Sequence, residues 1–400
     1  MKKLIVLLMI SIFFGNGFAF AAENQVSSQA SQKQTLVTFV YINGSNDLSY
    51  ENRLKFKEEF TKDVQKMHPL MVEGFEHDEL IYKNFLKSGN YKINPTPVIY
   101  YWGDRSLNEI KNIDSGLNSA KRYTPRIAQK VRSIFAHCLH DAIWVQKFTN
   151  MELVIDDLQK VVKNETDKGN KVVLFGYSAG SFITYQYFLN KFTSIVPNEL
   201  ISNQDNEEIQ EIIKNNPVQP TCLDALVEAD LVRLHTSGKF YANNDIEVIR
   251  KNYPNLDEKT KMACFKKDTV KGVVNFASPL ILFYSDVTDA STSINFLSQL
   301  MLKNIVENDI FFLTVNYRND PLGFPNSENL TMKKLQESNS ILAKYFKNGN
   351  GFVYNKSDLY VPRTFLTAHM AYWKTPKRFV KGVVNAYNEG LNVFYGKTCD

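Results

Sequence analysis

Short apolar runs alternate along this chain with longer segments in which apolar residues recur every three or four positions. The first pattern predicts strands buried on both faces, and the second predicts amphipathic helices. Strands are expected at residues 36–42, 97–102, 171–175, 270–276, 310–316 and 351–354, and helices at 54–67, 127–139, 151–162, 294–306, 330–346 and 376–387. Because helices follow strands in turn, we expect an α/β fold with a mostly parallel sheet of about six strands and helices on both faces.

One long segment departs from this alternation. Residues 191–267 are polar and contain four prolines, with an acidic patch at Glu207, Glu208 and Glu211. We expect a largely helical cap inserted above the carboxyl edge of the sheet. The predicted domains are therefore a core made of residues 35–190 and 268–400, with the cap between its two parts.

The first residues have the pattern of a signal peptide. Lys2 and Lys3 precede an apolar stretch at residues 4–14, and Ala19-Phe20-Ala21 supplies the small-x-small pattern that a signal peptidase requires. The stretch is shorter than the roughly 20 residues of a transmembrane helix, although an uncleaved anchor is the alternative. We therefore expect residues 1–21 to be removed, residues 22–34 to form a flexible lead-in, and the mature protein to be periplasmic or secreted.

Composition narrows the classes of partner. The formal net charge is +5 over 400 residues. No run of Lys and Arg interleaved with aromatic residues stands out, so nucleic-acid binding is not expected. His137 and His140 lie on one predicted helix without a third ligand nearby, so no metal site is expected. Four cysteines, an even count, predict one or two disulfides whose pairing stays open: Cys138, Cys222, Cys264 and Cys399.

Residues 176–180 read Gly-Tyr-Ser-Ala-Gly and match the pattern Gly-x-Ser-x-Gly. Alone the pattern is weak, but a predicted strand precedes it and a predicted helix follows at 181–189. The chain must turn sharply at Ser178, so the neighbouring positions must lack bulk, and the turn lifts the hydroxyl above the start of the helix. These features predict a nucleophile elbow with Ser178 as nucleophile and Gly176 and Gly180 as its small residues. The alternative is a simple strand-to-helix turn with a capping serine.

A serine nucleophile needs a base, and the base needs a carboxylate that orients it. In α/β folds whose serine nucleophile stands on such an elbow, the three residues follow one another along the chain in the order Ser, acid, His. Only His235 and His369 follow Ser178, and His235 falls inside the predicted cap, which leaves His369 as the base.

The acid should lie in a loop after a strand. Asp320 follows the strand 310–316 closely, in a loop shaped by Pro321, and is the predicted acid. Asp286 and Asp289 follow the preceding strand and are the alternatives.

An oxyanion hole needs two backbone N–H groups. The amide of Ala179 follows the nucleophile, and the amide of Ser45 lies in the loop after the first strand, where Gly44 permits a turn. Asn43-Gly44-Ser45 is also a glycosylation sequon, but a glycan there would block the site.

With these residues, the chain resembles an α/β-hydrolase of the lipase and esterase type. The resemblance spans about residues 36–387 in architecture and rests on short motifs, namely Asn43-Gly44, the elbow, Ala277-Ser278-Pro279-Leu280, Asn319-Asp320-Pro321 and the His369 loop. The chain departs from many members in having Asn43 where His often precedes the glycine, Ala277 where Gly is commoner, and no equivalent of the first two strands.

The resemblance implies a secreted serine hydrolase that cleaves a carboxylic ester through an acyl-enzyme, without a metal or organic cofactor. The substrate would be a small-molecule or lipid ester, with transient contact between the cap and a membrane or lipid surface. A thioesterase or peptidase with the same triad is one alternative, because the acyl-transfer chemistry is shared. A non-catalytic binding protein on the same fold is the other.

Overall fold

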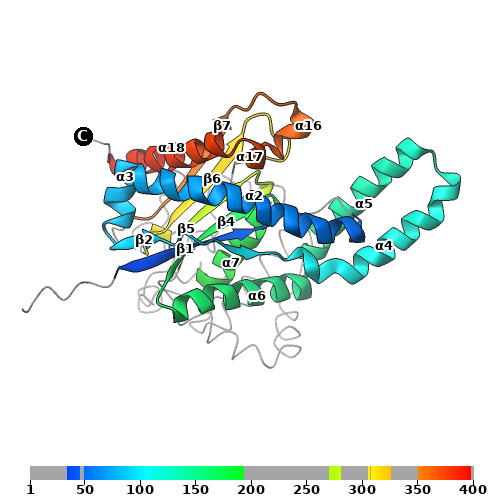
Figure 1. Cartoon of the computed structure of the whole chain (residues 1–400), viewed down its shortest axis with the longest axis horizontal. Helices are drawn as coiled ribbons and strands as arrows, with labels where there is room; N and C mark the ends of the chain where they lie inside the picture. The colour runs from blue at the N-terminus through cyan, green and yellow to red at the C-terminus, as the bar shows by residue number, and fades with distance from the viewer. Residues whose placement is uncertain are drawn as a thin grey trace, which may run out of the picture. The chain divides into compact units, whose positions relative to one another are not determined.

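Seven strands form the central sheet of the computed structural model (Figure 1), in the order β2-β1-β4-β5-β6-β7, with β3 also paired to β1. The strands are β1 (Thr35–Ile42), β2 (Tyr91–Ile93), β3 (Val98–Tyr100), β4 (Lys171–Tyr177), β5 (Val270–Phe276), β6 (Phe311–Tyr317) and β7 (Phe352–Leu359). Every pair from β3 through β1 to β7 is parallel. The predicted α/β class and mostly parallel sheet are confirmed. The sheet has seven strands where about six were expected, because the three residues of β2 include a lysine and form no apolar run.

The structure describes residues 34–45, 49–192, 270–280, 305–306, 308–325 and 350–397. The predicted signal peptide, lead-in and cap lie outside these ranges, as do His235, Asp286, Asp289 and the predicted helix 330–346. Three of the cysteines lie outside as well, and the side chain of Cys138 is not described, so the disulfides stay a prediction. Among the described helices, none is long and apolar enough to cross a membrane.

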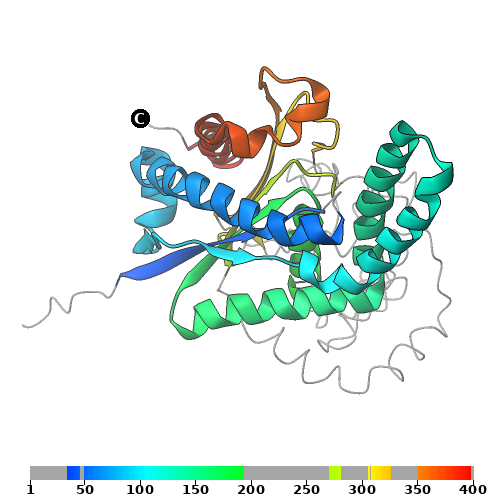
Figure 2. The same ribbon diagram turned by 45° about the vertical axis from the view of Figure 1, so that its right-hand side comes forward.

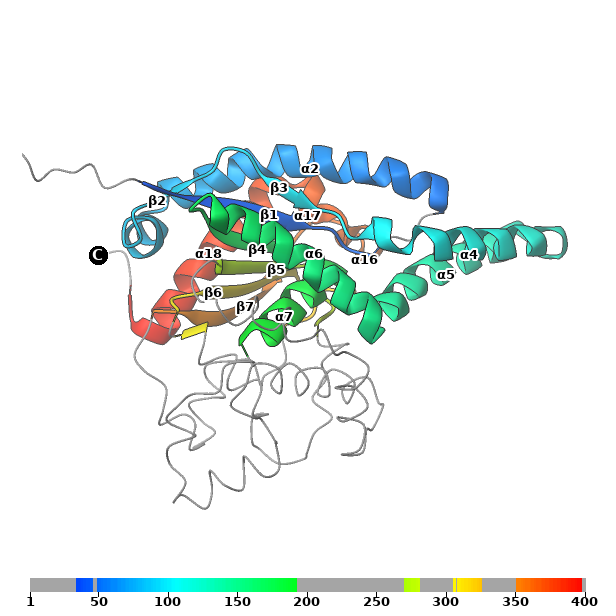
Figure 3. The same ribbon diagram turned by 90° about the horizontal axis from the view of Figure 1, so that it is seen from below.

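Helices cover both faces of the sheet (Figures 1 and 3). On one face lie α2 (Tyr50–His77) and α18 (Pro376–Tyr395), and on the other lie α6 (Phe148–Asp167) and α7 (Ala179–Phe192). The shorter helices are α3 (Glu79–Ile81), η1 (Tyr82–Leu86), η2 (Gly103–Ser106), α16 (Phe365–Ala368) and α17 (Ala371–Lys374).

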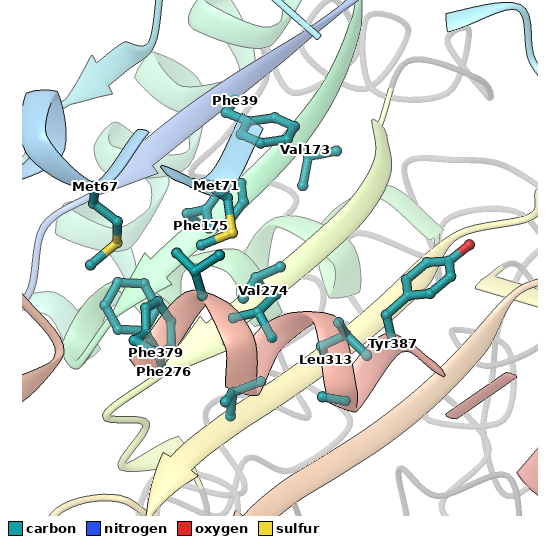
Figure 4. Close-up of a cluster of buried hydrophobic side chains, with 14 of the residues drawn as sticks. Phe39, Met67, Met71, Val173, Phe175, Val274, Phe276, Leu313, Phe379 and Tyr387 are labelled. Atoms are coloured by element: carbon teal, nitrogen blue, oxygen red, sulfur yellow. The ribbon is translucent and has the colours of Figure 1, made fainter. Parts of the chain in front are cut away.

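Side chains of β4 alternate between the two cores. Val172 and Leu174 pack against α6 and α7, whereas Val173 and Phe175 point to the face covered by α2 and α18. Figure 4 shows this second core, where Val173 and Phe175 meet side chains of α2 and α18. All four side chains are fully buried, and burial of each contributes about 1.5–3 kcal/mol. The continuous apolar run of the strand is thus explained by burial on both faces.

The chain changes direction across the sheet between β1 and β4. From β1 it passes through α2 to β3 on one side of β1, and it then returns through α6 to β4 on the other side. The helix that follows β1 (α2) and the helix that follows β4 (α7) lie on opposite faces of the sheet. The loops that lead to these two helices therefore diverge at the carboxyl edge. Such a switch point is where open α/β sheets bind ligands.

A helical hairpin stands beyond this edge (Figures 1 and 2). It consists of α4 (Leu107–Ala120) and α5 (Arg126–Gln146), joined by η3 (Lys121–Tyr123). At its base Arg53 of α2 donates hydrogen bonds to Asp141 over 2.8 Å and to Ser106 over 3.1 Å. Arg53 and Asp141 are both buried, so this ion pair fastens the hairpin to α2.

Candidate active site

Ser178 lies at the turn between β4 and α7 in a backbone conformation that is rare outside glycine. Its φ is 51°, and its N–H donates to Phe276 O over 2.9 Å. A Cβ on Gly176 would lie 2.5 Å from Asn275 Oδ1, and one on Gly180 would lie 2.7 Å from Ile42 O. Only glycine fits at either position without displacing its neighbours, and the surrounding contacts hold Ser178 in its strained conformation.

The structure brings the predicted nucleophile, base and acid into one hydrogen-bonded row. His369 Nε2 lies 3.0 Å from Ser178 Oγ, and His369 Nδ1 lies 3.0 Å from Asp320 Oδ1 and 3.2 Å from Oδ2. An ionised carboxylate only accepts, so Nδ1 carries the proton and Nε2 is left to accept from the serine hydroxyl. The Asp320 side chain is fully buried, whereas that of His369 is 20 % exposed, so of these two side chains only the imidazole is open to solvent.

Two further groups hold the carboxylate. Leu322 N donates to Asp320 Oδ1 over 3.0 Å, and the Tyr372 hydroxyl donates to Oδ2 over 2.9 Å. The same hydroxyl accepts from Tyr317 N over 2.8 Å. Burial and the neighbouring Asp320 raise the pKa of Tyr372 well above its usual value, so it keeps its proton and remains a donor. Tyr372 was not predicted from the sequence, where its only signal is the spacing of three residues from His369.

Tyr177 links the elbow to the segment that carries the base. Its hydroxyl donates to His369 O over 2.9 Å and lies 3.2 Å from Met370 Sδ. Its ring lies 5.4 Å from the imidazole and packs edge-on against Trp373 at 5.3 Å. The residue preceding the nucleophile therefore also positions the histidine backbone.

The loop after β1 packs against Ser178. A Cβ on Gly44 would lie 2.7 Å from Ser178 Cβ and 3.1 Å from Tyr177 O. Ser45 follows directly, and Ala179 is the first residue of α7, whose N–H has no acceptor within the helix. Of the two residues predicted to supply the oxyanion hole, Ala179 therefore follows Ser178 directly, and Ser45 follows the glycine that packs against it.

Asn43 fixes this loop to the end of β3. Its Oδ1 accepts from Trp102 N over 3.0 Å, its carbonyl accepts from Trp102 Nε1 over 2.8 Å, and its Nδ2 donates to Gly44 O over 2.8 Å. Asn43 is fully buried with its amide engaged, so the folded protein does not offer this sequon for glycosylation. Asn43, at the position where many lipases and esterases have His, therefore holds the loop after β1 against the end of β3.

A buried polar layer supports the elbow from below. Ser181 Oγ donates to Ser178 O over 2.6 Å, and Ser278 Oγ donates to Ser181 Oγ over 2.8 Å. Ser278 N in turn donates to Asn316 Oδ1 over 3.0 Å. The segment that begins at Ala277, itself at a φ of 52°, therefore stabilises the nucleophile turn.

The predicted site residues Ser178, His369, Asp320, Ala179 and Ser45 all lie at this one place. The histidines considered for a metal do not: His137 Nε2 pairs with Asp114 over 2.8 Å, and His140 lies 3.3 Å from Asp141. Among the described residues, no group of three potential ligands forms a metal site.

No protein-family model matches this chain, and no curated protein and no solved structure matches it either. Functional inference therefore rests on the geometry of the site.

Proposed function

We propose that this protein is a serine hydrolase of the α/β-hydrolase type that cleaves a carboxylic ester through an acyl-enzyme. The observation that carries the proposal is the row Ser178–His369–Asp320, with both hydrogen bonds at 3.0 Å. Its chain order is Ser, acid, His, and its nucleophile stands on a strained turn between a strand and a helix, as that fold requires. The position at the topological switch point gives further support.

In the proposed mechanism, Ser178 Oγ attacks the ester carbonyl carbon while its proton passes to His369 Nε2. The carbonyl oxygen becomes an oxyanion, which accepts hydrogen bonds from the N–H groups of Ala179 and Ser45. When the intermediate collapses, the alkoxide leaves with the proton from Nε2, and an acyl-enzyme remains. Water then attacks the acyl carbon, again passing its proton to Nε2. The carboxylic acid is released as Ser178 recovers its proton.

Asp320 has two tasks in this mechanism. Its hydrogen bond holds the imidazole in the tautomer whose Nε2 accepts, and its negative charge stabilises the imidazolium that forms at each attack. Tyr372 and Leu322 N hold the carboxylate in place for both tasks. We further propose that the protein acts after export, as its first residues predict.

Labelling with a fluorophosphonate probe and hydrolysis of a panel of p-nitrophenyl esters test the proposal. We expect the probe to modify Ser178 in the wild type. Ser178→Ala and His369→Ala should each lower kcat by on the order of 10⁴- to 10⁶-fold, with the double variant scarcely worse, because triad members act as a unit. Ser88→Ala removes an exposed hydroxyl that lies in the turn after η1 and donates to Asn84 O, and it serves as the control.

A folded Ser178→Ala variant that hydrolyses every ester as fast as the wild type would contradict the proposal. If the probe labels Ser178 but no ester is cleaved, the ester assignment is wrong, and thioesters and peptides become the substrates to try. An unlabelled Ser178 in folded protein supports a binding protein instead.

A further inference from the structure

The hairpin α4–α5 encloses a cavity that the triad does not use. It has a volume of about 680 Å³ and opens between α4, α5 and the first residues of α2. This volume lies within the range of small-molecule sites, about 300–1,000 Å³. The polar lining residues include Ser49, Ser115, Thr124, Gln129 and Ser133.

The charged side chains of the lining are mostly basic. Lys111, Lys121 and Arg132 face a single carboxylate, Asp114. Both oxygens of Asp114 are already engaged, because Oδ2 accepts from Tyr50 N over 2.7 Å and Oδ1 pairs with His137 over 2.8 Å. Asp114 is held in place by these bonds, and the lining carries the three positive charges against its single negative charge.

Among the residues that the structure describes, none of the three cations forms an ion pair with a carboxylate, and two of them contact neutral groups. Arg132 Nη1 donates to Thr124 Oγ1 over 3.1 Å, and Lys111 Nζ stands 4.4 Å from the centroid of the Tyr50 ring. Neither contact supplies negative charge. An anion entering the cavity would therefore meet cations that have not yet been neutralised by a carboxylate.

The sequence around the cavity is rich in basic residues. Residues 115–140 contain five basic residues and no acidic one: Lys121, Arg122, Arg126, Lys130 and Arg132. The next acid along the chain, Asp141, forms the buried ion pair with Arg53. This segment alone carries as many positive charges as the formal net charge of the whole chain, which is +5.

A second cavity shows that such an imbalance is not general on this protein. It lies between α2 and α18, has a volume of about 490 Å³, and is lined by Lys377 and Lys381 together with Glu73 and Asp78. Its two lysines are matched by two carboxylates, and His77 completes its titratable side chains. This cavity therefore provides a matched comparison for the hairpin cavity.

We propose that the cavity between α4 and α5 is a binding site for a ligand that carries a phosphate group. Two or more ammonium and guanidinium groups suit a doubly charged anion, and a guanidinium binds two phosphate oxygens at once. The hydroxyls of Ser49 and Ser115 supply further hydrogen-bond donors to such a group, whereas Thr124 and Gln129 already donate to backbone carbonyls. The site is independent of the proposed hydrolysis, since none of the cavity residues belongs to the triad.

Titration calorimetry of the full chain with inorganic phosphate and with glycerol phosphate tests the site. We expect both to bind in buffer of low ionic strength. The double variant Lys111→Gln/Arg132→Gln should bind at least roughly tenfold more weakly. Lys377→Gln/Lys381→Gln removes the same charge from the second cavity and should bind as the wild type does. Thermal melting of both variants checks that they are folded.

A second arm distinguishes a soluble phosphate from a lipid headgroup. Vesicles of phosphatidylglycerol, with phosphatidylcholine vesicles as reference, are sedimented with the protein. Tyr123 and Ile127 at the hairpin turn are 85 % and 81 % exposed, so Tyr123→Ser/Ile127→Ser should weaken vesicle binding if the ligand is a lipid and leave phosphate binding unchanged. Either source supports the site. It is overturned if neither phosphate nor vesicles bind, or if the α18 control weakens binding as much as the hairpin variant.

Discussion

The carboxylate of Asp320 accepts hydrogen bonds from three donors, and only one of them is the histidine. His369, Leu322 N and the Tyr372 hydroxyl together satisfy both of its oxygens. A buried carboxylate is stable only when its oxygens are satisfied in this way. The tyrosine therefore supports the charge that the proposed mechanism needs and fixes the direction in which the carboxylate faces the imidazole.

Tyr372→Phe should lower kcat with little change in KM. The substitution removes one hydrogen bond to a charged group, worth about 1.5–3 kcal/mol, which corresponds to roughly a 10- to 100-fold loss of rate if the bond matters fully in the transition state. Steady-state kinetics on a cleaved ester measure the loss. A melting curve of the same variant separates it from the stability cost of leaving Tyr317 N without its acceptor.

Tyr317→Phe is the matched control. This tyrosine is buried, its ring lies 4.3 Å from that of Tyr372, and its hydroxyl bonds to Thr375 over 3.2 Å and not to the carboxylate. It should retain the wild-type kcat. If both variants lose activity equally, Tyr372 acts through packing, and its bond to Asp320 is not what matters.

The sequence predicted the row of three residues but not the tyrosines that hold it. Ser178 stands in a motif whose glycines reflect a local turn, and His369 and Asp320 follow from chain order and strand ends. Tyr372 and Tyr177 read as ordinary core aromatics. Their hydrogen bonds depend on how the segment after β7 packs against β4 and β6, which no local pattern encodes.

At the scale of elements, the site depends on the close approach of the loop after β1 to the turn after β4. Gly180 packs against Ile42 O, and Gly44 packs against Ser178 itself. These contacts join neighbouring parallel strands at their carboxyl ends, where Ile42 pairs with Gly176. Side chains larger than hydrogen at these glycines would separate the two loops.

Gly44→Ala should therefore lower activity by about tenfold or more, since a misplacement of even 1 Å at a reacting group can cost about 100-fold. The added Cβ meets Ser178 Cβ at 2.7 Å and a backbone oxygen at 3.1 Å, so the loop must shift. Ester kinetics and probe labelling of Ser178 measure the effect.

Gly116→Ala is the control for this substitution. Gly116 lies inside α4, and an added Cβ there meets nothing within 4 Å. We expect unchanged activity and a gain in stability of about 0.5–1 kcal/mol, because alanine favours the helix. Wild-type activity in Gly44→Ala would show that the loop after β1 does not form part of the site.

The strands and helices that the sequence predicted are those with long, regular patterns. Residues 127–139 and 151–162 fall within α5 and α6 as expected, but α4 and β2 were not predicted. Apolar residues recur in α4 at helical spacing, at Leu107, Ile110, Ile113 and Leu117, but this short pattern among polar residues was not interpreted as a helix, and only Ile110 is fully buried. The helix expected at 54–67 runs on to His77 through Pro69, because Met71 and Phe75 beyond the proline are fully buried in the core.

On the scale of the whole molecule, the alternation of strands and helices predicts the α/β class but not the order of strands. The order depends on the face of the sheet that each connecting helix crosses. The first of these helices is α2, which connects β1 to β3 and so places β3 on the side of β1 away from β4. His68 fixes α2 to the sheet: its Nδ1 accepts from the Tyr41 hydroxyl over 3.3 Å, and its Nε2 donates to Asn94 O over 3.0 Å. The neutral imidazole is thus satisfied at both nitrogens.

Burial lowers the pKa of His68 below its usual value of 6.5, and the hydrogen bonds to the backbone carbonyls around Asn94 offset this only in part. A proton added at Nδ1 would displace the Tyr41 donor and place a charge among Phe39 and Tyr41. The unfolded chain binds that proton more readily than the folded protein. The stability that neutral His68 supplies is therefore complete above pH 6.5 and is lost as the pH falls toward the lowered value in the fold.

We therefore expect the free energy of unfolding to decrease as the pH is lowered from 7.5 through the range below 6.5, and His68→Gln to reduce that decrease. At pH 7.5 we expect the His68→Gln variant to be less stable than the wild type. Glutamine does not titrate, so the difference in free energy of unfolding between the two proteins should become smaller at low pH. Urea unfolding at a series of pH values measures both curves. His77→Gln changes an exposed histidine of the same helix and should leave the wild-type pH dependence intact. Parallel curves for the wild type and His68→Gln would mean that other groups cause the loss of stability in acid.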